Sequence, residues 1–181
     1  MTVEELLELP TIKGLKLISG NLGVHREIST VTVVDTPDGF QWLKGNEVVI
    51  TTTYALEKTP NAFLDFISKL LSRNISALIV KSDRYIKVIP ENAKKLCDEK
   101  ALPLIYCPAI YAFADIINPT LSGIISKQAE QLKESSKIHE SFLELATNDR
   151  SIHQILQTLS TLIQEPTAYV DTVFQDRKSV V

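Results

Sequence analysis

Between Ile28 and Tyr106, runs of β-branched and other apolar residues alternate with amphipathic helical patterns, and this alternation constrains the fold more than any other feature. The apolar runs lie at residues 28–34, 47–53, 75–81 and 102–106. The segments 60–73 and 90–100 separate the last three runs and are typical of helices that cover a sheet. Strands and helices in this order form βαβ units. The sequence therefore predicts an α/β fold with a mostly parallel sheet and flanking helices.

Further expectations concern the first part of the chain, up to residue 53. Residues 2–9 are expected to form a short helix with Thr2 as its N-cap, and residues 15–19 to form a strand. The near-continuous apolar end of the run at 28–34 predicts a strand that is buried on both faces, and the run at 47–53 carries the same signal.

A long helix is expected after Pro108, because residues 113–146 contain no strong helix breaker except Pro119 and Gly123. From residue 121 a stripe recurs with alternating spacings of four and three, as in a coiled coil, at Leu121, Ile125, Gln128, Leu132, Ser135, His139, Phe142 and Ala146. A lone helix cannot bury such a stripe. We therefore expect residues 120–147 to pair with a second copy in a homodimer; folding back onto the same domain is the alternative.

The last part of the chain reads as the beginning of another domain. Residues 148–151 break the long helix, residues 152–163 form a new amphipathic pattern, and residues 167–173 read as a strand. One helix and one strand are too little for an independent domain, so we expect them to belong to a longer protein. The expected division is a domain at 1–118, a connecting helix at 119–147 and the start of a second domain at 148–181.

Composition limits the class of protein. The 181 residues are 44% hydrophobic and 23% charged, as in globular proteins, and the net charge of −3 argues against a dedicated nucleic-acid-binding domain. Two cysteines exclude a disulfide scaffold and favour a reducing compartment. Because the sequence shows no signal peptide and no apolar run of about 18 residues, we expect a cytoplasmic protein without membrane contact.

Motifs for catalysis are missing from the sequence. We find no phosphate-binding or dinucleotide-binding glycine pattern, no nucleophile elbow and no His/Cys spacing suited to zinc. Cys97 and Cys107 read as buried, inert thiols. We therefore expect neither an enzyme nor a metal or cofactor site.

The best candidate for a ligand site lies where the predicted strands end. Asp35 follows the run at 28–34, and Thr51 and Thr52 lie at the end of the next run. Lys81 ends the third run, and Arg84 comes shortly after it. Ligands of open parallel sheets bind at the carboxyl ends of the strands, where hydroxyl groups and a cation can hold a small polar molecule. The alternative is an internal network of ion pairs among the same residues.

An ordered set of short segments gives the chain a family resemblance. These segments are TVEELL (2–7), LKLISG (15–20), VVDTPD (33–38), WLKGNEVVITT (42–52), YAL (54–56), ALIVK (77–81), RY (84–85), and LPLI (102–105) with Pro108. Together they resemble the N-terminal domain of the purine catabolism regulatory protein (PucR-like) family of bacterial transcription regulators, over roughly residues 1–125.

The resemblance implies an N-terminal sensory domain, a middle region related to GAF domains and a C-terminal helix-turn-helix that binds DNA. Residues 141–181 look similar to the start of the middle region, and the helix-turn-helix would lie beyond Val181. Such regulators control genes for the catabolism of purines, amino acids or related compounds. Where the family commonly has glycine after the paired threonines, this chain has Thr53, so either the turn or a pocket there differs.

Overall fold

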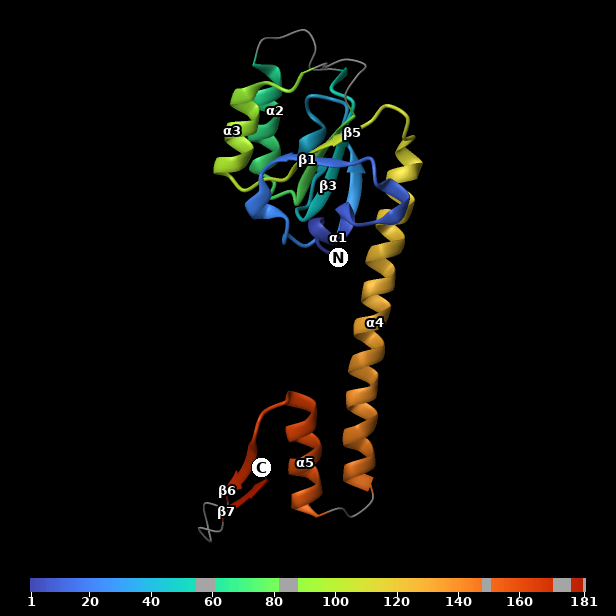
Figure 1. Ribbon diagram of the computed structural model, residues 1–181, viewed down its shortest axis with the longest axis vertical. Helices are drawn as coiled ribbons and strands as arrows, with labels where there is room; N and C mark the ends of the chain where they lie inside the picture. Colours follow the sequence, from blue (N-terminus) through green and yellow to red (C-terminus); the bar gives the residue numbers. More distant parts are fainter. Residues whose placement is uncertain (55–60, 82–87, 148–150, 171–176, 181) are drawn as a thin grey trace. The chain divides into compact units, whose positions relative to one another are not determined.

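The computed structural model describes residues 1–54, 61–81, 88–147, 151–170 and 177–180. The chain divides into two compact units, Met1–Lys127 and Gln128–Val181, and each is treated by itself. Figure 1 shows the helices and strands of both units.

The first unit is built on a five-stranded sheet with the strand order β1-β5-β4-β3-β2. Four neighbouring strands run parallel, namely β2 (Thr30–Val33), β3 (Glu47–Thr51), β4 (Ala77–Lys81) and β5 (Leu104–Cys107). The strand β1 (Lys16–Ser19) joins the edge of the sheet antiparallel to β5. The predicted α/β fold with a mostly parallel sheet is confirmed.

Helices cover both faces of this sheet (Figure 1). Side chains alternate across a strand, so Val49 faces the cluster formed with α2 (Ala62–Leu71) and α3 (Glu91–Glu99). Val48 and Ile50 face the opposite cluster. That second cluster is closed by α1 (Val3–Leu7), by the 3₁₀ helix η1 (Pro10–Ile12) and by the first part of α4 (Phe113–Thr147). The helices expected at 2–9, 60–73 and 90–100 are all present.

The prediction that both early strands are buried on both faces is correct for β3 and wrong for β2. Every residue of β3 is buried. In β2 three residues are half-buried and Val33 is exposed over 38% of its surface. The reason is position in the sheet: β2 is the edge strand and pairs only with β3, so no neighbour covers its outer side.

A close approach of two chain segments fixes the turn after β1. Gly20 has a φ of +77°, and a Cβ atom built there would lie 1.9 Å from the carbonyl oxygen of Leu102. Its N–H donates to Oδ1 of Asp98 at 2.6 Å. Only glycine fits this position without moving the backbone that leads into β5.

The long helix is confirmed and begins earlier than the connecting helix expected at 119–147. It spans Phe113–Thr147 and contains Pro119 in its second turn. Because proline has no N–H, the carbonyl group of Asp115 loses its helical partner. The side chain of Asp115 caps the start of the helix by accepting from the N–H of Ala112 at 2.7 Å.

The second unit contains α5 (Ile152–Ile163) and two antiparallel strands, β6 (Thr167–Val170) and β7 (Arg177–Val180). Ser151 and Gln154 form a capping box at the start of α5. Thr167 donates its hydroxyl to the carbonyl of Leu156 at 2.8 Å, which joins β6 to α5. The helix expected at 152–163 is therefore confirmed, and the strand expected at 167–173 is present over Thr167–Val170; residues 171–173 lie outside the described residues.

Candidate functional site

Asp35 joins the carboxyl ends of the edge strand β2 and its neighbour β3. It follows β2, and its Oδ1 accepts from the hydroxyl of Thr51 at 3.1 Å and from the N–H of Thr52 at 2.6 Å. The three residues that the sequence predicted at these two strand ends therefore lie together. In this arrangement one oxygen of the carboxylate is occupied by the protein, and it holds the chain that leaves β3.

Thr53 continues this turn with strained backbone geometry. Its φ is +64°, a left-handed conformation that glycine adopts readily and a β-branched residue does not. The residue is buried, its N–H donates to Oγ1 of Thr51 at 3.0 Å, and its hydroxyl donates to the carbonyl of Thr52. The family commonly has glycine at this position. The chain therefore adopts a left-handed turn here although the residue is threonine.

Lys81 lies at the end of β4 but bonds to a different part of the chain. Its Nζ donates to the carbonyl oxygen of Tyr111 and lies 4.9 Å from the centre of the Phe113 ring. Within the described part of the chain, no ion pair joins Lys81 to Asp35. Arg84, the fifth candidate, lies outside the described residues.

Groups that often carry catalysis have other roles here. Burial raises the pKa of Cys97 to about 12 and that of Cys107 to about 11, so both thiols stay protonated at neutral pH. His25 lies on the surface with Nδ1 3.2 Å from the Glu4 carboxylate. Over the described ranges, no group of three His, Cys, Asp or Glu side chains could hold a metal, and no helix could cross a membrane.

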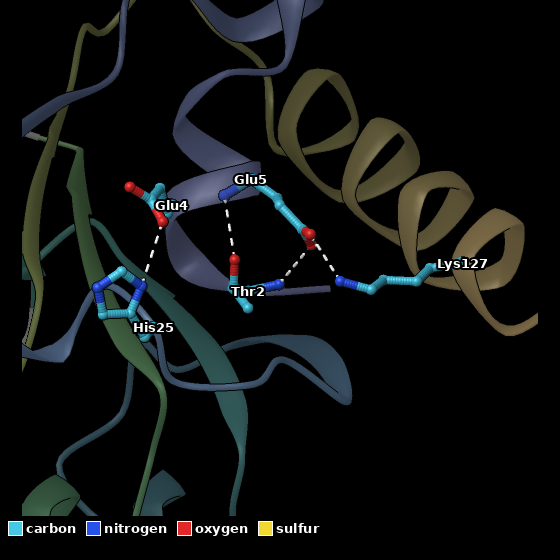
Figure 2. Close-up of polar contacts among 5 residues, drawn as sticks. All are labelled: Thr2, Glu4, Glu5, His25 and Lys127. Atoms are coloured by element: carbon cyan, nitrogen blue, oxygen red, sulfur yellow. Dashed lines mark hydrogen bonds and ion pairs between the residues drawn. The ribbon is translucent and has the colours of Figure 1, made fainter. Parts of the chain in front are cut away.

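An ion pair fastens α4 to the N-terminal helix (Figure 2). Glu5 accepts from the N–H of Thr2 through Oε2 at 2.8 Å and pairs through Oε1 with Nζ of Lys127 at 2.6 Å. The bond to Lys127 is the main reason that the pKa of Glu5 lies below its ordinary value. Ile116 and Ile124 on the same side of α4 are buried against the sheet.

A hollow of about 510 Å³ lies beside the start of α4 and has no counterpart in the sequence-based prediction. Thr11 of η1 lines one side. The other sides are formed by Ile110 and Tyr111, which precede the helix, and by Ala114, Asp115, Asn118 and Pro119 in its first turns. The only signal in the sequence that points to this place is a proline in the second turn of a helical pattern.

The comparisons with known proteins agree with the resemblance of the sequence motifs. The model of the purine catabolism regulatory protein-like family matches residues 5–124. The purine catabolism regulatory protein of Bacillus subtilis (strain 168) is 29% identical over 171 residues, which is 94% of this chain and 32% of that protein. The chain thus spans about a third of the length of this relative. No solved structure gives a significant match. Because the family model covers most of the chain, the chain belongs to the purine catabolism regulatory protein-like (PucR-like) family.

Proposed function

We propose that this chain is the signal-input and dimerisation region of a cytoplasmic bacterial transcription regulator of catabolic genes. The Bacillus subtilis relative is named as a regulatory protein, which supports a regulatory rather than an enzymatic role. In this proposal DNA is bound by a helix-turn-helix outside this chain, and residues 148–181 begin a GAF-like region. The net charge of −3 agrees with that division of labour.

The observation that carries the proposal is the distribution of charge around α4. If Leu121, Ile125, Gln128 and Leu132 are placed at the inner a and d positions of a heptad, every charged residue from 121 to 144 falls at an outer position. These charged residues are Lys127, Glu130, Lys133, Glu134, Lys137, Glu140 and Glu144. We call the uncharged side, with the a and d residues of 121–142, the α4 seam. A helix face that is free of charge over three heptads is typical of one that packs against another helix.

From Ile125 onward the α4 seam is exposed within one copy of the chain, whereas Leu121 is half-buried and packs against the sheet domain. Ile125 is 64% exposed and Leu132 is 69% exposed. In a helix each residue turns by about 100°, so Ile125 lies about 100° around α4 from the buried Ile124 and about 180° from the buried Ile116. A second copy can therefore cover the seam while α4 stays packed on its own sheet domain.

A light-scattering measurement on paired variants tests the dimer. Burying the exposed parts of Ile125 and Leu132 from two copies stabilises the pair by about 4–8 kcal/mol, at ~1–2 kcal/mol for each side chain. Replacing both by glutamate (I125E with L132E) should yield monomers. The matched variant S126E with K133E places the same residue type one position along, on the outer side, and should stay dimeric. A wild-type chain that is monomeric at ~100 µM, or a dimeric seam variant, would contradict the proposal.

The second part of the proposal is a small polar metabolite at the strand ends. The metabolite would bind the five strand-end candidates, Asp35, Thr51, Thr52, Lys81 and Arg84. Asp35 would use the carboxylate oxygen that does not accept from Thr51 and Thr52. The alternative is an assembly domain without a ligand, whose GAF-like neighbour does the sensing. A thermal-shift screen of catabolic metabolites separates the two. A metabolite that stabilises wild type but not K81A and R84A supports the site, whereas equal stabilisation of all three places the ligand elsewhere.

A further inference from the structure

The hollow beside the start of α4 combines an apolar wall with polar groups, as ligand sites do. Its volume of about 510 Å³ is that of a site for a small molecule. Ile110 is exposed over 87% of its surface, and Tyr111, Ala114 and Pro119 extend the apolar wall. Exposed apolar side chains that gather around a hollow gain free energy when a ligand removes them from water.

The one charged side chain among the described residues that line the hollow is the Asp115 carboxylate, which only accepts, whereas Thr11 and Asn118 can donate as well as accept. Asp115 accepts from Ala112 through Oδ2, which leaves its Oδ1 for another donor. Its backbone carbonyl lacks the usual helical donor four residues further on, because Pro119 has no N–H. Among the described residues that line the hollow there is no lysine, arginine or histidine. A ligand that brings N–H donors therefore satisfies this hollow, and an anion is repelled by Asp115.

The wall of the hollow is held in place before any ligand arrives. The hydroxyl of Tyr111 accepts from the N–H of Gly14 at 3.1 Å, and its carbonyl accepts from Nζ of Lys81. A Cβ atom at Gly14 would lie 2.7 Å from the Tyr111 ring, so the ring rests directly on the backbone there. Because the wall is already fixed, less conformational entropy is lost when a ligand binds.

We infer that this hollow binds a small molecule that presents N–H donors on a compact apolar body, such as an amidine or a primary amide on a ring. The donors meet Asp115, and the apolar body lies against Tyr111 and Ile110. None of the residues that line the hollow belongs to the proposed strand-end site, although Lys81 of that site bonds to the carbonyl of Tyr111. The inference does not depend on dimerisation through α4.

Benzamidine is a suitable probe, with benzoate as a matched compound of the same ring and opposite charge. The full 181-residue chain is titrated with each compound, and backbone amide shifts are followed by NMR. We expect benzamidine to shift the amides of Thr11 and of residues 110–118, and benzoate to leave them unchanged. Shifts that map elsewhere, or equal responses to the two compounds, would overturn the inference.

Three variants locate the binding energy. Asp115→Asn keeps an oxygen for the N–H of Ala112 but removes the charge, and it should weaken benzamidine binding by about tenfold. Ala114→Leu fills the hollow from an exposed helical position and should abolish binding while circular dichroism stays unchanged. Asp38→Asn makes the same change of charge at an exposed residue outside the hollow and should bind as wild type. Undiminished binding by Asp115→Asn, or by folded Ala114→Leu, would refute the site. Light scattering on the same samples reports the dimer separately.

Discussion

The strongest structural prediction concerns Asp35, whose removal leaves the chain after β3 without its anchor. In Asp35→Ala the N–H of Thr52 and the hydroxyl of Thr51 both lose their acceptor. A hydrogen bond to a charged group contributes about 1.5–3 kcal/mol. Because Asp35 is only half-buried, the lower end applies, and the two bonds together give a loss of about 3 kcal/mol in the free energy of unfolding.

The matched variant Asp35→Asn isolates the part that is due to charge. Asparagine keeps an oxygen at the same place, and a neutral hydrogen bond is about half as strong as a charged one. The expected loss is therefore ~1.5 kcal/mol, midway between wild type and Asp35→Ala. Asp38→Ala is the control, because the exposed carboxylate of Asp38 accepts from no N–H of the 3₁₀ helix η3 (Gly39–Trp42) that follows it. Its expected loss in the free energy of unfolding is below ~0.5 kcal/mol.

Urea unfolding followed by far-ultraviolet circular dichroism gives the three free energies. Hydrogen exchange of the Thr52 amide gives a local measurement, because that N–H donates directly to Asp35. Its exchange should speed up in Asp35→Ala before the chain unfolds globally. The reasoning is refuted if Asp35→Ala is as stable as Asp38→Ala within ~0.5 kcal/mol, or if exchange at Thr52 does not change.

The remaining predictions concern pH, thiol chemistry and one turn. Since the pKa of Glu5 is lowered, its pair with Lys127 stabilises the fold above the ordinary pKa of 4.5, and this is lost as the pH falls through the lowered pKa. Glu5→Gln should therefore unfold more easily than wild type at pH 7 and equally easily at pH 2; a constant difference would contradict this. Cys97 and Cys107 should react with a disulfide reagent at pH 8 only after unfolding, and a fast native reaction would show exposed thiolates. Gly20→Ala should lower stability by more than ~3 kcal/mol in urea unfolding, because its Cβ meets a carbonyl oxygen at 1.9 Å; a loss below ~1 kcal/mol would show that the turn can adjust.

Local pattern was sufficient to predict the elements of the sheet domain but not the position of each strand within the sheet. The run at 28–34 has the composition of a buried strand, yet β2 lies at the edge. Whether a strand is central or at an edge depends on the order of all strands, which composition does not encode. The antiparallel place of β1 beside β5 is likewise a long-range pairing.

The sequence likewise predicted only part of the candidate site. Asp35, Thr51 and Thr52 lie together because the carboxyl ends of neighbouring parallel strands meet at one edge. The partner of Lys81 was not predictable, because the segment that contains Tyr111 has no periodic pattern that places it in space. The hollow beside α4 was missed for a related reason: η1 and the start of α4 are about 100 residues apart in the sequence and meet only in the fold.

Within Met1–Lys127, α4 is connected to the rest of the domain at two places that respond to different chemistry. Near its start, Tyr111 is bonded to Lys81 at the end of β4 and to the N–H of Gly14. About four turns further on, Lys127 is paired with Glu5. A helix is stiff over this length of about 20 Å. A displacement of α4 near Tyr111 therefore also displaces Lys127, unless the ion pair with Glu5 breaks. A ligand at the strand ends or in the hollow can use this connection only if it binds one placement of α4 more tightly than another. The size of any signal passed along α4 is therefore limited by that difference in affinity, which is a measurable quantity, and not by the total strength of ligand binding.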